Sequence, residues 1–234
     1  MTAYDIAAEL PPIDRLRERC KALAVLERIL DGGYPYYTYT TAWGADEAAL
    51  MSNGSGDEWA VVFTADGAFI RVFDHESKMT PYRDPDLELW PGLLDGLPAV
   101  FLPQLDEPAF GDGTGLDTFV ATAVLWRLTG DDRWHAGAGI DFPALRGPYD
   151  DIGPDGTGLL RILLDDIVDR YVDFAEDYYE RKPDRAAVEH VVASRPLTDA
   201  VVRALNPAMT LAELRDDLAA LGYPPEAGQD RGPR

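Results

Sequence analysis

Residues 13–30 carry apolar side chains at steps of three and four, the spacing that places them on one face of an α-helix. This stripe predicts a helix whose buried face consists of Ile13, Leu16, Cys20, Leu23, Leu26 and Leu30. Two prolines precede the segment and an Asp-Gly-Gly sequence follows it, which is typical of the two ends of a helix. We expect the polar residues outside the stripe, Arg15, Arg19 and Glu27, to face solvent.

From residue 34 onward the pattern has a period of two, which is typical of β-strands. It predicts three or four strands, over residues 34–43, 59–65 and 68–74, with residues 48–52 able to form a further strand after the first. A glycine-rich turn at 53–57 separates residues 48–52 from 59–65, and Asp66-Gly67, a common hairpin sequence, separates residues 59–65 from 68–74. Because strands joined by such short turns pair in antiparallel fashion, we expect a β-meander.

The middle of the chain is less regular. Residues 91–106 predict short helical turns interrupted by prolines, and residues 137–158 predict a loop rich in Gly, Pro and Asp. Residues 118–128 fit either a helix or a strand. We favour a strand, because a turn sequence at 129–132 allows residues 133–135 to form a returning strand.

Residues 158–180 predict a long helix, because apolar residues again recur at alternating steps of four and three. Its packing seam consists of Leu160, Leu164, Ile167, Tyr171, Phe174 and Tyr178. The neighbouring face carries four mutually repelling aspartates, Asp165, Asp169, Asp173 and Asp177. This row is either a solvated face, partly relieved by Arg161 and Arg170, or a docking surface for a basic partner.

The chain changes character after residue 182. Residues 184–222 predict three short helices, the last of which begins at Thr210 with Glu213 as its capping-box partner and ends at Gly222. Two helices around Asn206-Pro207 suggest a helix-turn-helix, but this segment lacks the basic cluster that phosphate contacts require.

These elements together predict the α+β class. We expect an antiparallel β-meander packed by an N-terminal helix and a long acidic helix, with a small helical C-terminal appendage. The expected organisation is an α+β domain over residues 1–182, the appendage over 183–223 and a disordered tail over 224–234.

The net charge of the chain disfavours some classes of binding partner and favours others. The chain has 42 acidic and 21 basic residues, which gives a formal net charge of −21. Such a surface repels nucleic-acid phosphate and anionic lipid, and it accelerates the encounter with a basic protein. Solubility alone also explains acidity. The single cysteine, Cys20, excludes an internal disulfide, and we expect it to be a small core residue in a cytoplasmic protein without a signal or transmembrane segment.

The common catalytic motifs are absent from the sequence. We find no phosphate-binding GxxxxGK[ST], no GxSxG, no HExxH and no CxxC pair. Residues 151–156 resemble the start of a calcium loop, but Gly153 and Ile162 occupy the third and twelfth positions, where ligands belong. We therefore expect no cofactor.

The segment 74–92, DHESKMTPYRDPDLELWPG, is the strongest candidate for function. It follows the last strand of the meander, and binding residues concentrate on loops that leave a rigid scaffold. A metal site from Asp74, His75 and Glu76 is disfavoured, because adjacent strand residues point to opposite faces. A hydrolytic pairing of Ser77 with His75 is disfavoured because no oxyanion hole is evident. A structural hydrogen bond from His75 and a recognition role both remain open.

The order of several motifs resembles a family of uncharacterised bacterial cytosolic proteins. The motifs are NGSGD at 53–57, HES at 75–77, MTPY at 79–82, WPG at 90–92, Arg133-Trp134 and DFAEDYYE at 173–180. The resemblance covers roughly residues 15–180 and implies a coherent fold without assigning catalytic residues. In acidity and size the chain also resembles immunity proteins of bacterial toxin systems, including those of the SUKH type.

The sequence thus favours an interaction protein that occludes a basic protein partner, with a toxin-neutralising immunity protein as the preferred role. The expected partner-binding residues are His75, Glu76, Tyr82, Arg83, Trp90, Asp165, Asp169 and Asp173. We expect no catalytic residues and no metal ligands. The alternative is an enzyme or small-ligand-binding protein that uses His75 and Glu76 at a pocket mouth, together with Asp57 or His135. A structural subunit with a broad apolar patch is a third possibility.

Overall fold

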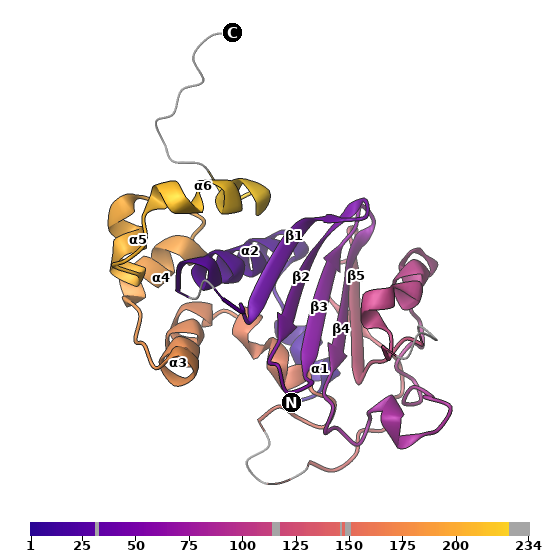
Figure 1. Cartoon of the computed structure of the whole chain (residues 1–234). Helices are drawn as coiled ribbons and strands as arrows, with labels where there is room; N and C mark the ends of the chain where they lie inside the picture. The colour runs from indigo at the N-terminus through magenta and orange to yellow at the C-terminus, as the bar shows by residue number, and fades with distance from the viewer. Residues whose placement is uncertain (31–32, 114–117, 146, 148–150, 225–234) are drawn as a thin grey trace.

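The computed structural model of the chain describes residues 1–30, 33–113, 118–145, 147 and 151–224. Its centre is a six-stranded antiparallel sheet in which each strand pairs with the next one along the chain (Figure 1). The strands are β1 (Tyr37–Trp43), β2 (Asp46–Ser52), β3 (Glu58–Phe63), β4 (Gly67–Phe73), β5 (Ala123–Leu128) and β6 (His135–Ala136). The predicted α+β class and meander are confirmed, including the strand that we favoured within residues 118–128.

Both faces of the sheet are buried. On one face, Met51, Val61, Ile70 and Leu125 belong to the core that includes helix α2 (Ile13–Leu30). On the other face, Val62, Phe69, Val124 and Trp126 pack with Phe101 and Phe110. These two phenylalanines come from the short 3-10 helices η2 (Ala99–Asp106) and η3 (Pro108–Phe110). Because side chains alternate between the faces of a strand, each strand of the centre contributes to two cores.

Helix α2 has the predicted bounds, and Cys20 lies on its buried face. The prediction that Arg19 and Glu27 face solvent is wrong, because α2 is covered by the sheet on one side and by C-terminal helices on the other. The Arg19 guanidinium donates hydrogen bonds to the Leu163 carbonyl at 2.6 Å and to the Asp165 carboxylate at 2.6 Å. Glu27 is completely buried.

A short N-terminal helix, α1 (Ala3–Glu9), adds to the expected elements. Thr2 and Asp5 form a capping box at its start, and Ile6 is fully buried. The backbone N–H of Ala3 donates to the buried Asp155 carboxylate at 2.7 Å. Seven residues span fewer than two periods of an apolar stripe, so the hydrophobic pattern gives little indication of this helix.

The long helix predicted over residues 158–180 is wrong in its first part. The chain forms a 3-10 helix, η4 (Thr157–Leu163), and then an α-helix, α3 (Ile167–Tyr179), with Leu164 extended between them. The buried Arg19 side chain holds the Leu163 carbonyl and the Asp165 carboxylate, two groups at this break. Those bonds stabilise an interruption that the regular spacing of apolar residues does not report.

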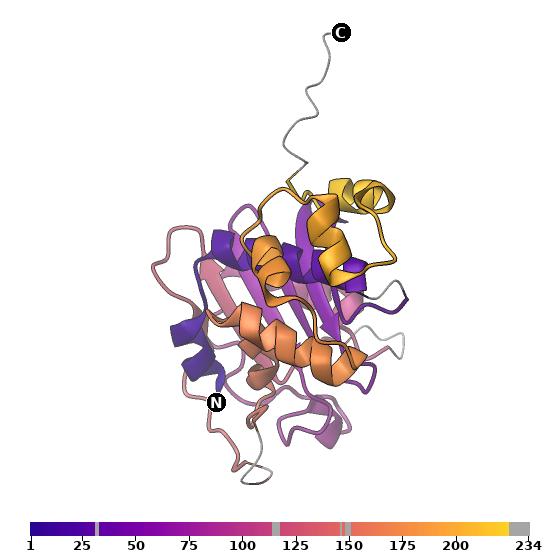
Figure 2. The same cartoon turned by 90° about the vertical axis from the view of Figure 1, so that its left-hand side faces the viewer.

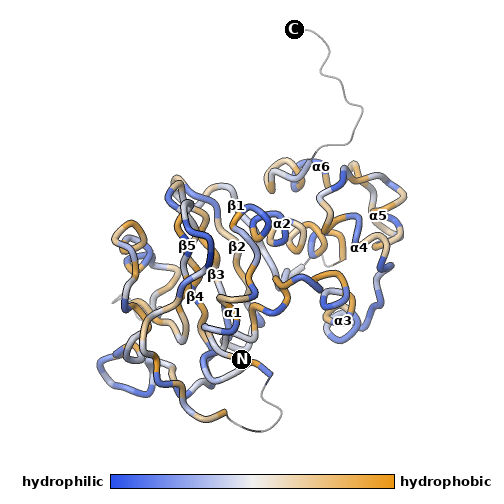
Figure 3. Tube along the Cα trace, turned by 180° about the vertical axis from the view of Figure 1, so that it is seen from behind, coloured by the Kyte–Doolittle hydropathy of each residue, from blue (hydrophilic) through white to orange (hydrophobic). Residues whose placement is uncertain are grey.

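Three helices, α4 (Arg185–Val192), α5 (Asp199–Leu205) and α6 (Leu211–Ala220), follow as predicted. Thr210 and Glu213 form the expected capping box. The helices cover the side of α2 that faces away from the sheet (Figure 2), and Val188, Val191 and Val202 are fully buried in the same core as α2. Hydrophobic and hydrophilic stretches alternate along these helices (Figure 3), as expected where one side packs.

The end of the chain was predicted to form a tail. Residues 225–234 of the predicted tail lie outside the described residues. Within the described residues, no helix is both long enough and apolar enough to cross a membrane.

Candidate functional site

Two aspartates meet at the end of the central hairpin. In the β3–β4 register, Trp59 lies opposite Val72 and Glu58 opposite Phe73. One step further along the same register, Asp57 falls opposite Asp74. Residues two apart in a strand point to the same face, so both carboxylates lie on the α2 face, beyond Trp59 and Val72. Both aspartates are buried, with 7% and 1% of their surface exposed.

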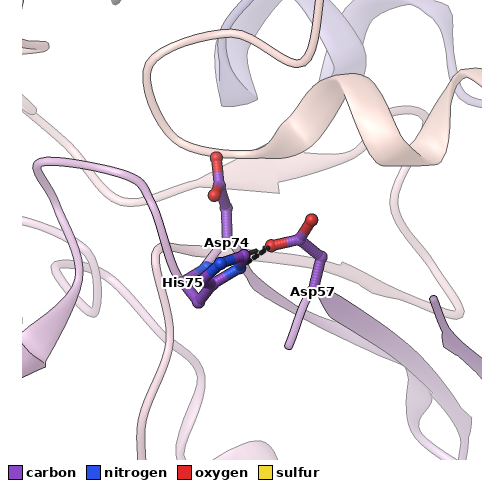
Figure 4. Close-up of side chains that lie close together, drawn as sticks. All are labelled: Asp57, Asp74 and His75. Atoms are coloured by element: carbon purple, nitrogen blue, oxygen red, sulfur yellow. Dashed lines mark hydrogen bonds and ion pairs between the residues drawn. The ribbon is translucent and has the colours of Figure 1, made fainter. Parts of the chain in front are cut away.

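His75 completes this cluster. Its Nδ1 lies 2.7 Å from Asp57 Oδ1, and its backbone N–H donates to the same oxygen at 3.1 Å. The Asn53 side-chain amide donates to Asp57 Oδ2 at 2.7 Å. Figure 4 shows the three side chains gathered at the strand ends, with His75 bonded to Asp57. One potential ligand atom from each of Asp57, Asp74 and His75 lies within 4.8 Å of the other two.

The contact between His75 and Asp57 shifts both pKa values. Burial raises the pKa of the Asp57 carboxyl, but the hydrogen bonds from His75 and Asn53 outweigh burial, and the resulting pKa lies below the usual value. The hydrogen bond to Asp57 raises the pKa of His75, with the nearby carboxylates adding to this effect. The pair therefore favours a charged imidazolium beside a charged carboxylate. The His75 side chain is 40% exposed, so solvent reaches the pair.

Asp74 is fixed from several directions. Its Oδ1 accepts a hydrogen bond from the Glu76 N–H at 2.9 Å, and its own N–H donates to Thr122 Oγ1 at 3.1 Å. Gly156, which has a φ of +79°, passes so close that a Cβ there would lie 2.6 Å from the Cβ of Asp74. Neighbouring Asp155 accepts hydrogen bonds from the N–H and hydroxyl of Thr157. A tightly packed polar layer thus underlies the cluster.

Ser77 has a structural role in this layer. Its hydroxyl donates to the Pro154 carbonyl at 2.6 Å and accepts from the Met79 N–H at 3.0 Å, and the residue is buried. The His75 ring is bonded to Asp57 instead. This arrangement agrees with the expectation that Ser77 and His75 do not form a hydrolytic pair. Glu76 is exposed beside them.

The far end of the 74–92 loop holds its aromatic residues in fixed positions. The Arg83 guanidinium lies over the Trp90 ring, 5.1 Å from the ring centroid, and donates to the carbonyls of Thr80 and Glu88. Trp90 Nε1 donates to the Asp141 carbonyl at 3.0 Å. Tyr82 packs edge-on against Phe73 and remains 52% exposed. Arg83 and Trp90 therefore contact each other, while Tyr82 packs against Phe73 at the end of β4.

The aspartates of the acidic helix lie elsewhere. Helix α3 and the 74–92 loop lie on opposite sides of the sheet (Figures 1 and 2). Asp165 is paired with Arg19 at 2.6 Å and Asp169 with Arg185 at 2.7 Å, and each hydrogen bond lowers the pKa of its aspartate. Asp173 is exposed. The loop and these aspartates therefore lie on different sides of the sheet.

The other two histidines do not join the cluster. His135 Nε2 lies 3.3 Å from Asp131 Oδ2, and His190 Nε2 lies 2.9 Å from the Pro196 carbonyl. His135 pairs with Trp126 in the sheet, opposite Phe69, which places it about 20 Å along the strand direction from residue 75. The alternative function, a pocket with His75 and Glu76 at its mouth, required either Asp57 or His135 nearby. The structure places Asp57 beside His75 and His135 far from it.

Asp57 and Asp74 are the residues whose combination sequence analysis missed. Asp57 was assigned to a turn and Asp74 to a strand end, and their meeting depends on the register across the hairpin. The signal was present, because counting outward from the Asp66-Gly67 turn places them opposite each other. Comparison of the chain with protein-family models, with curated proteins and with solved structures finds no match.

Proposed function

We propose that the protein binds a basic protein partner through the 74–92 loop and inhibits that partner by covering its surface, as a toxin-neutralising immunity protein does. The observation that carries this proposal is the fixed arrangement of Tyr82, Arg83 and Trp90. Tyrosine, tryptophan and arginine are the residues that dominate the binding energy of protein interfaces. Anchors already held by hydrogen bonds lose little entropy when a partner binds.

Charge supports a basic partner. The net charge of −21 accelerates encounters with a positively charged protein and suppresses encounters with acidic ones. Asp84, Asp86 and Glu88 lie in the same loop as these three residues; Asp86 and Glu88 are exposed and Asp84 is partly buried. Asp169 and Asp173 on α3, and Asp165 just before it, act at a distance in this proposal, because α3 lies on the other side of the sheet from the loop.

The partner is to be isolated by cross-linking in the source cells and then tested with purified components. Alanine substitution of Trp90 or Tyr82 is expected to cost about 2 kcal/mol of binding energy, which weakens the Kd about 30-fold. Tyr178→Ala serves as the matched control, because Tyr178 is 50% exposed and lies on α3. Its affinity should equal that of the wild type. Loss of binding in Tyr178→Ala with full binding in the two loop variants would contradict the proposal.

A catalytic role for His75 and Glu76 is the second candidate. The contact of His75 Nδ1 with Asp57 favours it, because a carboxylate that orients an imidazole is the arrangement of many general bases. The two functions respond differently to substitution. An enzyme loses turnover in His75→Ala and keeps it in Trp90→Ala, whereas the binding protein loses partner affinity in Trp90→Ala.

A further inference from the structure

We propose that Asp57, Asp74 and His75 form a binding site for one divalent transition-metal ion, with Zn²⁺ as the preferred ion. This inference does not depend on the proposed partner, because it concerns the isolated protein. It revises the expectation from sequence that the chain has no metal ligands. That expectation considered Asp74, His75 and Glu76, whereas the structure supplies Asp57 from the neighbouring strand.

The distances are close to those of a coordination sphere. Zinc binds nitrogen and oxygen ligands at about 2.0–2.2 Å, so two ligands of a tetrahedral site lie about 3.3 Å apart. His75 Nδ1 and Asp57 Oδ1 are 2.7 Å apart, and the atoms of all three residues lie within 4.8 Å of one another. Coordination by Nδ1 replaces its hydrogen bond to Asp57. Binding one ion therefore requires side-chain rotations that change the separations between these ligand atoms by up to about 1.5 Å.

The position of the two carboxylates favours a cation. Like charges directly opposite each other on adjacent strands are destabilising, and burial strengthens the repulsion. Asp57 and Asp74 occupy such opposed positions and are both more than nine-tenths buried. The two positive charges of a divalent ion neutralise the two carboxylates and remove the repulsion between them. This burial separates the site from the exposed groups of acidic residues that are common on protein surfaces.

Hydrogen bonds from neighbouring groups orient the ligands. The Asn53 amide and the Glu76 N–H each hold one oxygen of an aspartate, as outer hydrogen bonds do around metal ligands. The 40% exposed side chain of His75 leaves an entry path and space for water as the fourth ligand. Two carboxylates and an imidazole suit Zn²⁺, whereas Ca²⁺ requires six to eight oxygen ligands.

Isothermal titration calorimetry with Zn²⁺, on tag-free protein stripped with a chelator, tests the proposal. We expect one ion per chain with a Kd below about 10 μM. His75→Ala and Asp57→Asn should each weaken binding at least about 100-fold, and Asn53→Ala about 10-fold. His135→Ala is the matched control, because His135 also lies beside an aspartate, and it should bind like the wild type.

The exposed position of His75 keeps the test independent of folding, and circular dichroism verifies that each variant is folded. Binding of Zn²⁺ with these losses, and much weaker binding of Mg²⁺ or Ca²⁺, supports the site. Absence of saturable Zn²⁺ binding, or equal losses in His75→Ala and His135→Ala, overturns it. Neither result bears on the partner surface, which is measured with Trp90→Ala and a second protein.

Discussion

Glu27 is a buried carboxylate with four hydrogen-bond donors around it. Tyr171 donates to Oε1 at 2.8 Å, while Tyr179 and the backbone N–H groups of Tyr36 and Tyr37 donate to Oε2. These donors belong to α3 and to the start of β1, so one side chain joins three parts of the fold. Burial raises the pKa of Glu27, although the hydrogen bonds oppose this shift.

Replacing Glu27 by alanine should lower the free energy of unfolding by about 3 kcal/mol or more, because it leaves several buried donors without an acceptor. Urea denaturation followed by circular dichroism measures this loss. Glu18→Ala, on the exposed side of the same helix, should change stability by less than about 0.5 kcal/mol, since its ion pair with Arg15 is solvated. Equal effects of the two substitutions would contradict this account.

The raised pKa of Glu27 also makes its contribution depend on pH. A carboxyl group that binds its proton more tightly in the folded state stabilises the fold fully below its unfolded pKa, which is about 4.5 for glutamate. That contribution disappears as pH rises through the folded pKa. The difference in unfolding free energy between wild type and Glu27→Gln should therefore be largest below the unfolded pKa and decrease as pH rises above it. A difference that is constant or grows with pH counts against the prediction.

For single residues, the sequence correctly predicted that Cys20 is buried, but it did not predict the burial of Arg19 and Glu27. Periodicity identifies the face of a helix that carries apolar side chains, and Cys20 belongs to that face. It does not show that a second layer will cover the polar face. The partners of Arg19 and Glu27 on η4 and α3 are more than 140 residues away in sequence.

The secondary-structure elements predicted best are those that depend on residues close together in the sequence. Helix α2 has the expected bounds, and the Asp66-Gly67 turn joins β3 to β4 as its sequence indicated. The break between η4 and α3 was not predicted, because it depends on Arg19 from another helix. Local propensity and spacing thus determine where elements occur, and distant side chains decide where one of them is interrupted.

The loop before η4 packs closely against Asp74 at Gly156, and a substitution of this glycine tests that packing. Gly156→Ala should destabilise the protein by about 2–4 kcal/mol, because it combines a positive φ with a Cβ contact of 2.6 Å. Gly139→Ala isolates the backbone effect, since its φ is +70° and nothing lies within 4 Å of the added Cβ. This control should cost about 1 kcal/mol. Thermal denaturation of both variants measures the difference, and equal melting temperatures would refute the close approach.

The C-terminal helices test the expected domain boundary at residue 182. Val188, Val191 and Val202 are fully buried in the core that contains α2. A chain that ends at Lys182 should therefore expose apolar surface, bind a hydrophobic dye and lose cooperative unfolding. Dye fluorescence and urea denaturation measure these properties. A truncated chain as stable as the full chain would show that residues 1–182 form an independent domain.

The molecule as a whole carries a charge that opposes its own compactness. With a net charge of −21, self-repulsion destabilises the folded state, and salt screens it. Raising NaCl from about 20 to 300 mM should raise the melting temperature by several degrees. Potassium chloride should have the same effect, because screening depends on ionic strength. An unchanged or lower melting temperature would mean that the ion pairs described above outweigh the repulsion.

The candidate site was predicted in part at this scale. The 74–92 loop, its aromatic residues and its place after the strand that ends at Phe73 follow from the sequence. The separation of this loop from α3 does not, because it depends on which face of the sheet each element covers. The meeting of Asp57 with Asp74 required the strand register as well as the strands themselves.

The strand order leaves β1 at one edge of the sheet and the two-residue β6 at the other. Edge strands are templates onto which other chains can add strands. Near the end of β1, the Thr41 hydroxyl donates to the Ala220 carbonyl of α6 at 3.0 Å, and Gly222 lies close by. The appendage therefore lies against one end of this edge strand, and we expect a chain without it to form intermolecular β-sheet more readily as well as to unfold.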